Sequence, residues 1–197
     1  MNMKAAAAEV VAANADSHSQ VPVADFEMWM ASEQKRIYRL CLRMLGSDHE
    51  ADSATQDAFL KAFRTLQRSP ETVIEEPAKW LTRIAVNTCL DQLRSRRWQF
   101  WRRRPSAAEE TAAMERAQAN YRSAEDLLAA RELSRRFTAA LEKLSPRQRA
   151  VFVLRHEDGK SLIEIGELLH LDVGTVKGHM GRALKTLRKE LKDLYEC

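Results

Sequence analysis

The scarcity of glycine and proline constrains the fold of this chain more than any other feature of its sequence. The 197 residues include six glycines and five prolines, which is about half the share found in an average protein. Tight turns depend on these two residue types, whereas the chain is rich in the strong helix formers Ala, Leu, Arg and Glu. The composition therefore excludes an all-β fold and predicts long helices.

Helix-start and helix-stop signals indicate where these helices lie. Gly46 follows an apolar series at helical spacing and is expected to end the first helix, while Pro77 and Pro146 are expected to begin later helices. Three serines at expected helix starts are followed by Glu or Gln three residues later, which predicts capping boxes: Ser47 with Glu50, Ser145 with Gln148, and Ser161 with Glu164. The predicted helices cover residues 26–45, 48–66, 77–104, 127–144, 146–158, 162–169 and 173–194.

We therefore expect an all-α protein with two small helical domains joined by a flexible linker. Residues 25–104 are predicted to form the first domain and residues 127–197 the second. Residues 105–126 are polar, Ala-rich and acidic, with weak periodicity, and are predicted to be the linker. Residues 1–24 are predicted to be a disordered tail rather than a signal peptide, because they hold a single Lys and because Glu9 interrupts the apolar run.

Positive charge is concentrated in two segments. Residues 80–104 carry seven arginines against one aspartate, and residues 131–197 carry 14 basic against 10 acidic side chains. An acidic stretch separates the two segments. Nucleic-acid-binding proteins concentrate positive charge where the phosphates run, so this distribution favours a nucleic-acid partner over an evenly solvated surface.

Residues 161–192 have the pattern of a helix-turn-helix, with a short helix, a tight turn and a longer helix. In such a motif the first helix braces the second, whose N-terminal residues read base edges in the major groove. The outer face of the longer helix is basic: Lys177, Arg182, Lys185, Arg188, Lys189 and Lys192. From spacing alone, an amphipathic hairpin with a solvated basic face remains the alternative.

The first basic segment interleaves arginines with aromatic side chains. Unpaired bases stack on aromatic faces while arginines hold the backbone, so the segment is typical of single-strand binding. The aromatic residues are Trp80, Trp98, Phe100 and Trp101. Two alternatives remain open: Trp80 is a core residue, or residues 94–104 lie on an anionic membrane surface.

The sequence carries no signature of catalysis or of a bound cofactor. There is no Gly-rich phosphate loop, no nucleophile motif and no paired metal-ligating side chains, so we expect no enzymatic activity, metal, cofactor or small-molecule substrate. No run of 18 uncharged apolar residues is present, so membrane insertion is not expected. The three cysteines form no C-x-x-C pair, which is typical of a reducing cytoplasm.

Three stretches together resemble the bacterial RNA polymerase sigma factors of the extracytoplasmic-function (ECF) group. They are residues 54–66 (ATQDAFLKAFRTL), residues 80–94 (WLTRIAVNTCLDQLR) and residues 144–188, which begin LSPRQRAVFVLRHEDGKS. They follow one another in the family's order, with a variable linker before the last. The resemblance implies a factor that makes core RNA polymerase promoter-specific, with residues 25–104 as region two and residues 127–197 as region four.

The resemblance also implies partners and site residues. Region two is expected to bind the beta-prime clamp of core RNA polymerase through four residues: Gln56, Asp57, Lys61 and Arg64. It is expected to hold the unpaired minus-ten strand through six more: Trp80, Arg83, Asn87, Arg94, Arg96 and Arg97. Region four is expected to bind the beta flap and to read the minus-thirty-five duplex through nine: Arg147, Arg149, Thr175, Lys177, Gly178, His179, Gly181, Arg182 and Lys185. An anti-sigma factor is a further implied partner.

Departures from the family pattern leave parts of this assignment open. The loop before Pro77 is acidic and lacks the usual Phe-Arg-Gly start, which leaves the minus-ten base preference undetermined. Gly181 stands where the family commonly has an aromatic or long side chain, so duplex readout is expected to depend more on Lys177, His179, Arg182 and DNA shape. A stand-alone helix-turn-helix regulator is the alternative, although it leaves residues 54–94 without a role. A helical adaptor that contacts only proteins would differ by showing little salt dependence.

Overall fold

We describe the protein from a computed structural model, which covers residues 26–69, 74–102 and 124–194. The predicted N-terminal tail and most of the predicted linker lie outside these residues. The described part consists of seven α-helices and one short 3-10 helix, without strands. The prediction of an all-α fold is confirmed.

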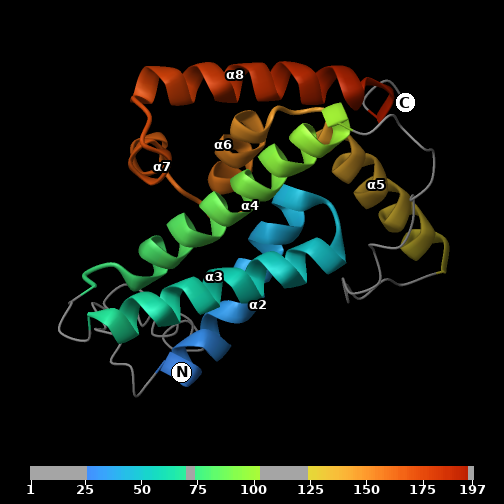
Figure 1. The fold of residues 1–197 in the computed structure, drawn as a ribbon. Helices are drawn as coiled ribbons and strands as arrows, with labels where there is room; N and C mark the ends of the chain where they lie inside the picture. Colours follow the sequence, from blue (N-terminus) through green and yellow to red (C-terminus); the bar gives the residue numbers. More distant parts are fainter. Residues whose placement is uncertain (1–25, 70–73, 103–123, 195–197) are drawn as a thin grey trace, which may run out of the picture.

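The first three helices pack into one unit. Helix α2 (Phe26–Leu45) runs into α3 (Asp48–Arg68), and α4 (Pro77–Arg102) lies against both (Figure 1). Gly46 has a φ of 77° and ends α2, and Pro77 begins α4, as predicted. The apolar faces of the three helices bury Ile37, Leu40, Met44, Leu45, Ala54, Ala58, Phe59, Leu66, Leu81, Val86 and Leu90.

The remaining helices form the second unit. They are α5 (Ala124–Glu142), α6 (Pro146–His156), α7 (Leu162–Leu169), α8 (Val173–Glu190) and a 3-10 helix (Lys192–Leu194). Helices α7 and α8 are the predicted helix-turn-helix. Helix α5 begins at Ala124, three residues before its predicted start. A core between α5, α6 and α8 contains Ala140, Leu141, Leu144, Phe152, Ala183, Leu187 and Leu191.

Two of the three predicted capping boxes are present. The hydroxyl of Ser145 accepts from the Gln148 amide at 3.4 Å, and that of Ser161 accepts from the Glu164 amide at 3.2 Å. The third predicted capping box, Ser47 with Glu50, is absent. Helix α3 begins after Ser47, but the Ser47 side chain forms no capping bond. The carboxylate that would close the box, Glu50, instead contacts the guanidinium of Arg96 on α4.

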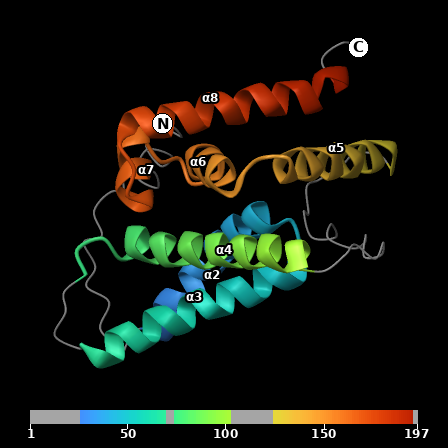
Figure 2. The same cartoon turned by 45° about the horizontal axis from the view of Figure 1, so that its top comes forward.

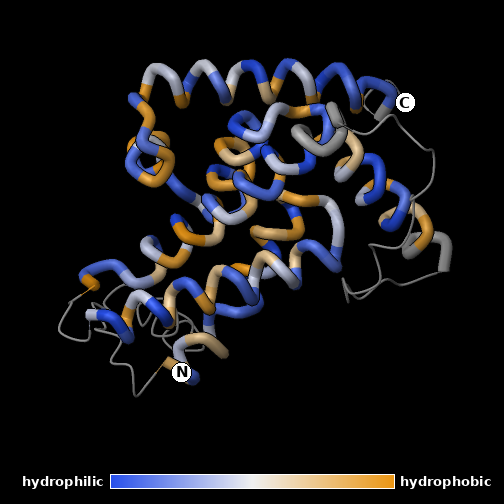
Figure 3. The backbone as a smooth tube through the Cα atoms, in the orientation of Figure 1, coloured by the Kyte–Doolittle hydropathy of each residue, from blue (hydrophilic) through white to orange (hydrophobic). Residues whose placement is uncertain are grey.

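The two units lie directly on each other. In Figure 2, α5 to α8 form a layer over α2, α3 and α4. Helix α6 contacts both α2 and α4, and α7 contacts α4. Side chains from α6 and α7 belong to the same buried cluster as the core of the first unit: Ala150, Val151, Val153, Leu154, Ile165 and Leu168. Figure 3 shows the alternation of hydrophobic and hydrophilic residues along the helices that permits this layering. The sequence did not indicate this closed arrangement.

Candidate nucleic-acid and polymerase interfaces

Helix α8 presents the exposed basic face that the sequence predicts. It lies along the side of the molecule away from α2 and α3 (Figures 1 and 2). Lys177, Arg182 and Lys185 are exposed on it. Its N-terminus is capped by Asp172, whose carboxylate accepts hydrogen bonds from the Thr175 hydroxyl and, at 2.8 Å, from the Thr175 backbone amide. These two hydrogen bonds lower the pKa of Asp172. An exposed row of cations on a well-capped helix suits contact with duplex phosphates and bases.

In the middle of the α8 face, the imidazole of His179 lies beside Arg182 and feels the charge of Arg147 on α6. Partial burial, followed by the charges of Arg182 and Arg147, lowers the pKa of His179. The Nη2 atom of Arg182 lies 3.5 Å from Nδ1 of His179. On either side of this imidazole, Gly178 is half-buried and Gly181 is exposed, so the helix backbone itself is accessible there. The arrangement offers hydrogen-bonding groups without a second positive charge at His179.

The two arginines of α6 have different surroundings. Arg147 is half-buried, and its Nη1 donates to the Leu169 carbonyl within the same unit at 3.2 Å. Arg149 is 5% exposed, and its Nη1 donates to the Met44 carbonyl of α2 at 2.7 Å. Arg149 therefore has no access to DNA while the two units are packed together.

The predicted minus-ten residues lie along α4. The Trp80 ring is half-buried and stacks on Trp29, with the ring centroids 6.5 Å apart. Arg83 is half-buried, and its Nε has no hydrogen-bond partner among the described residues. Asn87 is exposed. Positions 80, 83 and 87 follow helical spacing, so one face of α4 carries an aromatic, a cation and an amide. Trp80 packs partly as a core residue, which was one of the two open alternatives.

The arginines at the end of α4 differ in their contacts. Arg94 is exposed and pairs with Asp91 at 3.3 Å. Arg96 contacts Glu50, and burial lowers the pKa of its guanidinium. The side chain of Arg97 lies outside the described residues. Arg94 is thus the more accessible of the two described cations.

The predicted polymerase-binding residues occupy α3. Gln56, Asp57 and Arg64 are exposed. Lys61 is also exposed, and its ammonium donates to the Thr88 hydroxyl of α4 at 2.8 Å. Both acidic and basic side chains therefore line the outer surface of α3, on the opposite side of the molecule from α8 (Figure 2).

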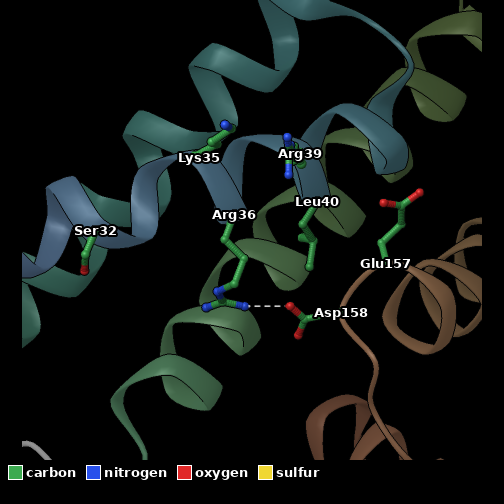
Figure 4. A pocket seen from close by; sticks show the side chains of 7 residues that line it. All are labelled: Ser32, Lys35, Arg36, Arg39, Leu40, Glu157 and Asp158. Atoms are coloured by element: carbon green, nitrogen blue, oxygen red, sulfur yellow. Dashed lines mark hydrogen bonds and ion pairs between the residues drawn. The ribbon is translucent and has the colours of Figure 1, made fainter. Parts of the chain in front are cut away.

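Sequence reasoning missed the ion pairs between the two units. Arg36 pairs with Asp158 at 2.7 Å, beside a surface pocket between α2 and the turn after α6 (Figure 4). Its guanidinium also donates to the Thr82 hydroxyl at 2.8 Å. Because Arg36 and Asp158 lie 122 positions apart, no local sequence signal indicates their pairing.

The part of the chain that the structure describes contains neither a candidate metal site nor a helix suited to spanning a membrane. Among residues 26–69, 74–102 and 124–194, no group of three or more His, Cys, Asp or Glu side chains is placed to hold a metal ion. Within the same residues, no helix is long and apolar enough to cross a membrane.

Comparisons with known families agree with the division into two units. Residues 29–99 match the family described as Sigma-70 region 2, and residues 134–187 match Sigma-70, region 4. The fold and these two matches define the class of protein, which is the sigma factors of bacterial RNA polymerase.

Individual relatives narrow the class. The ECF RNA polymerase sigma factor SigW of Bacillus subtilis is 37% identical over 160 residues, which cover 81% of this chain and 84% of that protein. The ECF RNA polymerase sigma factor SigE of Mycolicibacterium smegmatis is 35% identical, over 79% of this chain and 57% of that protein. The chain belongs to the ECF group of RNA polymerase sigma factors, as its motifs predicted.

Solved structures support the fold. The sigma factor RpoE of Bartonella quintana, solved in complex with the anti-sigma factor NepR, has a TM-score of 0.64 at 21% identity, covering 85% of this chain and 97% of that one. CnrH, solved in complex with the cytosolic domain of CnrY, has a TM-score of 0.55 at 24% identity, and the match covers 86% of this chain and 89% of CnrH.

Proposed function

We propose that the chain uses three separate surfaces to start transcription at specific promoters. The exposed face of α3 binds the beta-prime clamp of core RNA polymerase, the face of α4 holds the unpaired minus-ten strand, and α8 reads the minus-thirty-five duplex. Region four also binds the beta flap. The observation that carries the proposal is the exposed basic face of α8 on a capped helix-turn-helix, in a chain whose α3 and α4 carry the other two motifs.

Recognition is divided between the two units. Region four positions polymerase on the duplex upstream, through phosphate contacts that orient it and base contacts that specify the site. Region two then retains one melted strand, and a flipped base leaves its stack at a cost that hydrogen bonds and aromatic contact offset. The chain contributes no catalytic group of its own, because the polymerase performs the chemistry.

The closed arrangement has to open for both elements to be read at once. The elements are centred about 25 base pairs apart, which is about 85 Å of duplex at roughly 34 Å per ten base pairs. Helix α6 contacts both α4 and α8, so these two helices are separated by one helix layer, or about 20 Å. We infer that the closed form is the state of the free chain and that the promoter-bound state is open.

Two further assignments follow from the same function. Some structural relatives were solved with an anti-sigma factor or the cytosolic domain of a partner, and we propose that an anti-sigma factor also binds this chain. Because its work requires RNA polymerase, we place the chain in the cytoplasm. We retain residues 25–104, 105–126 and 127–197 as region two, linker and region four, after a tail of residues 1–24.

The decisive test is a binding titration against bacterial core RNA polymerase. Saturable binding is expected, and Asp57→Lys is expected to abolish it because a cation replaces an exposed carboxylate in the proposed clamp surface. Asp52→Lys makes the same change at another exposed position of α3 and is expected to have a smaller effect. Intact binding to duplex DNA without binding to polymerase would instead support the stand-alone regulator.

A further inference from the structure

Three ion pairs between described residues of the two units share one polarity. Region two supplies the cation in each of the three, and region four supplies the carboxylate. The pairs are Arg36 with Asp158 at 2.7 Å, Arg43 with Glu157 at 3.2 Å, and Lys79 with Glu167 at 2.7 Å. In the closed form, an acidic edge of region four therefore covers basic side chains of region two. Figure 4 shows the first pair, joining α2 to the turn that follows α6.

Lys79 differs from the other two cations in its position. It lies on α4, directly before Trp80 and one helical turn before Arg83, so it shares the helix face that we assign to the minus-ten strand. Arg36 and Arg43 lie on α2. A phosphate that follows the bases held by α4 would pass close to an ammonium at this position.

The Lys79 ammonium has carboxylate partners on two sides in the closed form. It lies 2.7 Å from Glu167 of α7 and 2.9 Å from Glu76, one turn earlier. Its side chain is 18% exposed. Hydrogen bonds to these two carboxylates raise the pKa of Lys79, so the amine stays charged. The charge is present, but Glu167 occupies the side from which a phosphate would approach across the interface.

Separation of the units changes this environment. Glu76 belongs to region two and stays beside Lys79, whereas Glu167 moves away with α7. Opening therefore removes one of the two carboxylates from Lys79 and leaves an N–H donor of its ammonium available for another acceptor.

We propose that Lys79 is a further contact to the phosphates of the unpaired minus-ten strand, and that Glu167 competes with those phosphates in the closed form. This inference rests on the proposed function, because it requires region two to hold a single strand. It adds a residue that the family motif did not supply. It also assigns region four a role in keeping the free chain from binding single strands.

The test compares the free chain with its complex with core RNA polymerase. The probe is a short fluorescent single-stranded DNA of mixed sequence, titrated over a salt series, because a phosphate contact is independent of sequence. In the polymerase complex, Lys79→Ala is expected to weaken binding by about two- to fivefold and to reduce the salt slope by about 0.7. Lys79→Arg keeps the charge and is expected to keep the slope.

Glu167→Gln tests the competition. In the free chain it is expected to strengthen binding by about two- to fivefold, because Lys79 is released. In the polymerase complex it is expected to change nothing, because the units are already apart. Combined with Lys79→Ala, it is expected to have no effect in the free chain either. Glu157→Gln removes the carboxylate partner of Arg43, another pair between the two units, and is the matched control, with little expected change.

Three results would overturn the proposal. The first is an unchanged salt slope for Lys79→Ala in the polymerase complex, with normal thermal melting of the variant. The second is stronger single-strand binding by Glu167→Gln that persists when Lys79→Ala is also present. The third is an equal increase in binding from Glu157→Gln. Either of these two results would mean that the substitution opens the units in general. Failure of the proposed function would differ, because the unaltered chain would then not bind polymerase at all.

Discussion

The guanidinium of Arg149 donates a hydrogen bond from Nη1 to the main-chain carbonyl oxygen of Met44, 2.7 Å away and 105 positions earlier in the chain. Met44 lies in the last turn of α2, where carbonyls lack partners within the helix and the helix dipole is negative. Burial lowers the pKa of the Arg149 guanidinium. The contact satisfies an acceptor of region two with a donor of region four, so it exists only while the units are closed.

Arg149→Glu is expected to open the molecule. A carboxylate at this position would face the carbonyl of Met44 at the negative end of α2, and the lost charged hydrogen bond alone is worth about 1.5–3 kcal/mol. The radius of gyration from small-angle X-ray scattering is expected to rise. Arg147→Glu is the control, because Arg147 bonds to Leu169 within its own unit. An unchanged radius for Arg149→Glu would contradict a closing role for this contact.

Asn87→Ala is expected to weaken open-complex formation by about tenfold, the loss of roughly one hydrogen bond to the single strand. The side chain is exposed, so the change should leave the thermal stability of the chain unaltered. Permanganate footprinting on a promoter reports strand opening, and a parallel titration reports affinity for core polymerase. If both quantities fall together, the role assigned to Asn87 is wrong.

Lys177→Ala is expected to weaken binding to the minus-thirty-five duplex. Removal of one phosphate contact should reduce the slope of log affinity against log salt by about 0.9. Fluorescence anisotropy with a promoter duplex measures this slope. Lys143→Ala removes another exposed lysine, directly after α5, and should leave the slope unchanged; equal loss from the two variants would indicate a general charge effect.

Gly181→Ala is expected to stabilise the chain by about 0.5–1 kcal/mol, because Gly181 stands in an exposed helix interior where an added Cβ meets no atom within 4 Å. Affinity for the duplex should fall if the backbone of α8 approaches DNA there. Gly166→Ala is the opposite case, since its Cβ would lie 2.7 Å from the Leu171 carbonyl oxygen. Gly166→Ala is therefore expected to lower the thermal unfolding temperature, whereas Gly181→Ala raises it. Stabilisation by Gly166→Ala would contradict the close approach of Gly166 to the Leu171 carbonyl.

The stability of region four is expected to depend on pH through Asp172. Hydrogen bonds from Thr175 lower its pKa in the folded chain, so its stabilising contribution is complete above the unfolded pKa of about 3.9 and is lost as the pH falls through the lower folded value. Melting temperatures between pH 5 and pH 3 test this. Asp172→Ser keeps a capping oxygen without a titrating group, and an identical acid dependence in that variant would exclude Asp172 as the cause.

Local sequence signals predicted most of the elements because their causes are local. A capping box needs residues three positions apart, so Ser145 and Ser161 were correctly assigned. The Ser47 box failed because Glu50 has a competing partner, Arg96, on another helix. The end of α7 at Leu169 was predicted correctly, but no sequence signal indicated that His170, which is not a glycine, adopts a left-handed φ of 53° there. Tertiary context overrides local preference at such positions.

The candidate surfaces were predicted to different degrees for the same reason. The basic face of α8 and the exposed face of α3 follow from helical periodicity, which depends only on the chain's own spacing. The burial of Arg149 and the pairing of Lys79 with Glu167 involve residues far apart in sequence. Charge and exposure of a single residue in isolation say nothing about which partner covers it.

The sequence by itself determined the helices, two of the three predicted capping boxes, the order of the two sigma regions and the outward basic face of α8, because each depends on side chains within a few turns of one another. Only the tertiary structure decided that the two regions pack together and that Met44 and Glu167 acquire partners in the other region. Those contacts arise from burial of apolar faces and pairing of charges across more than 80 positions, which local patterns do not encode.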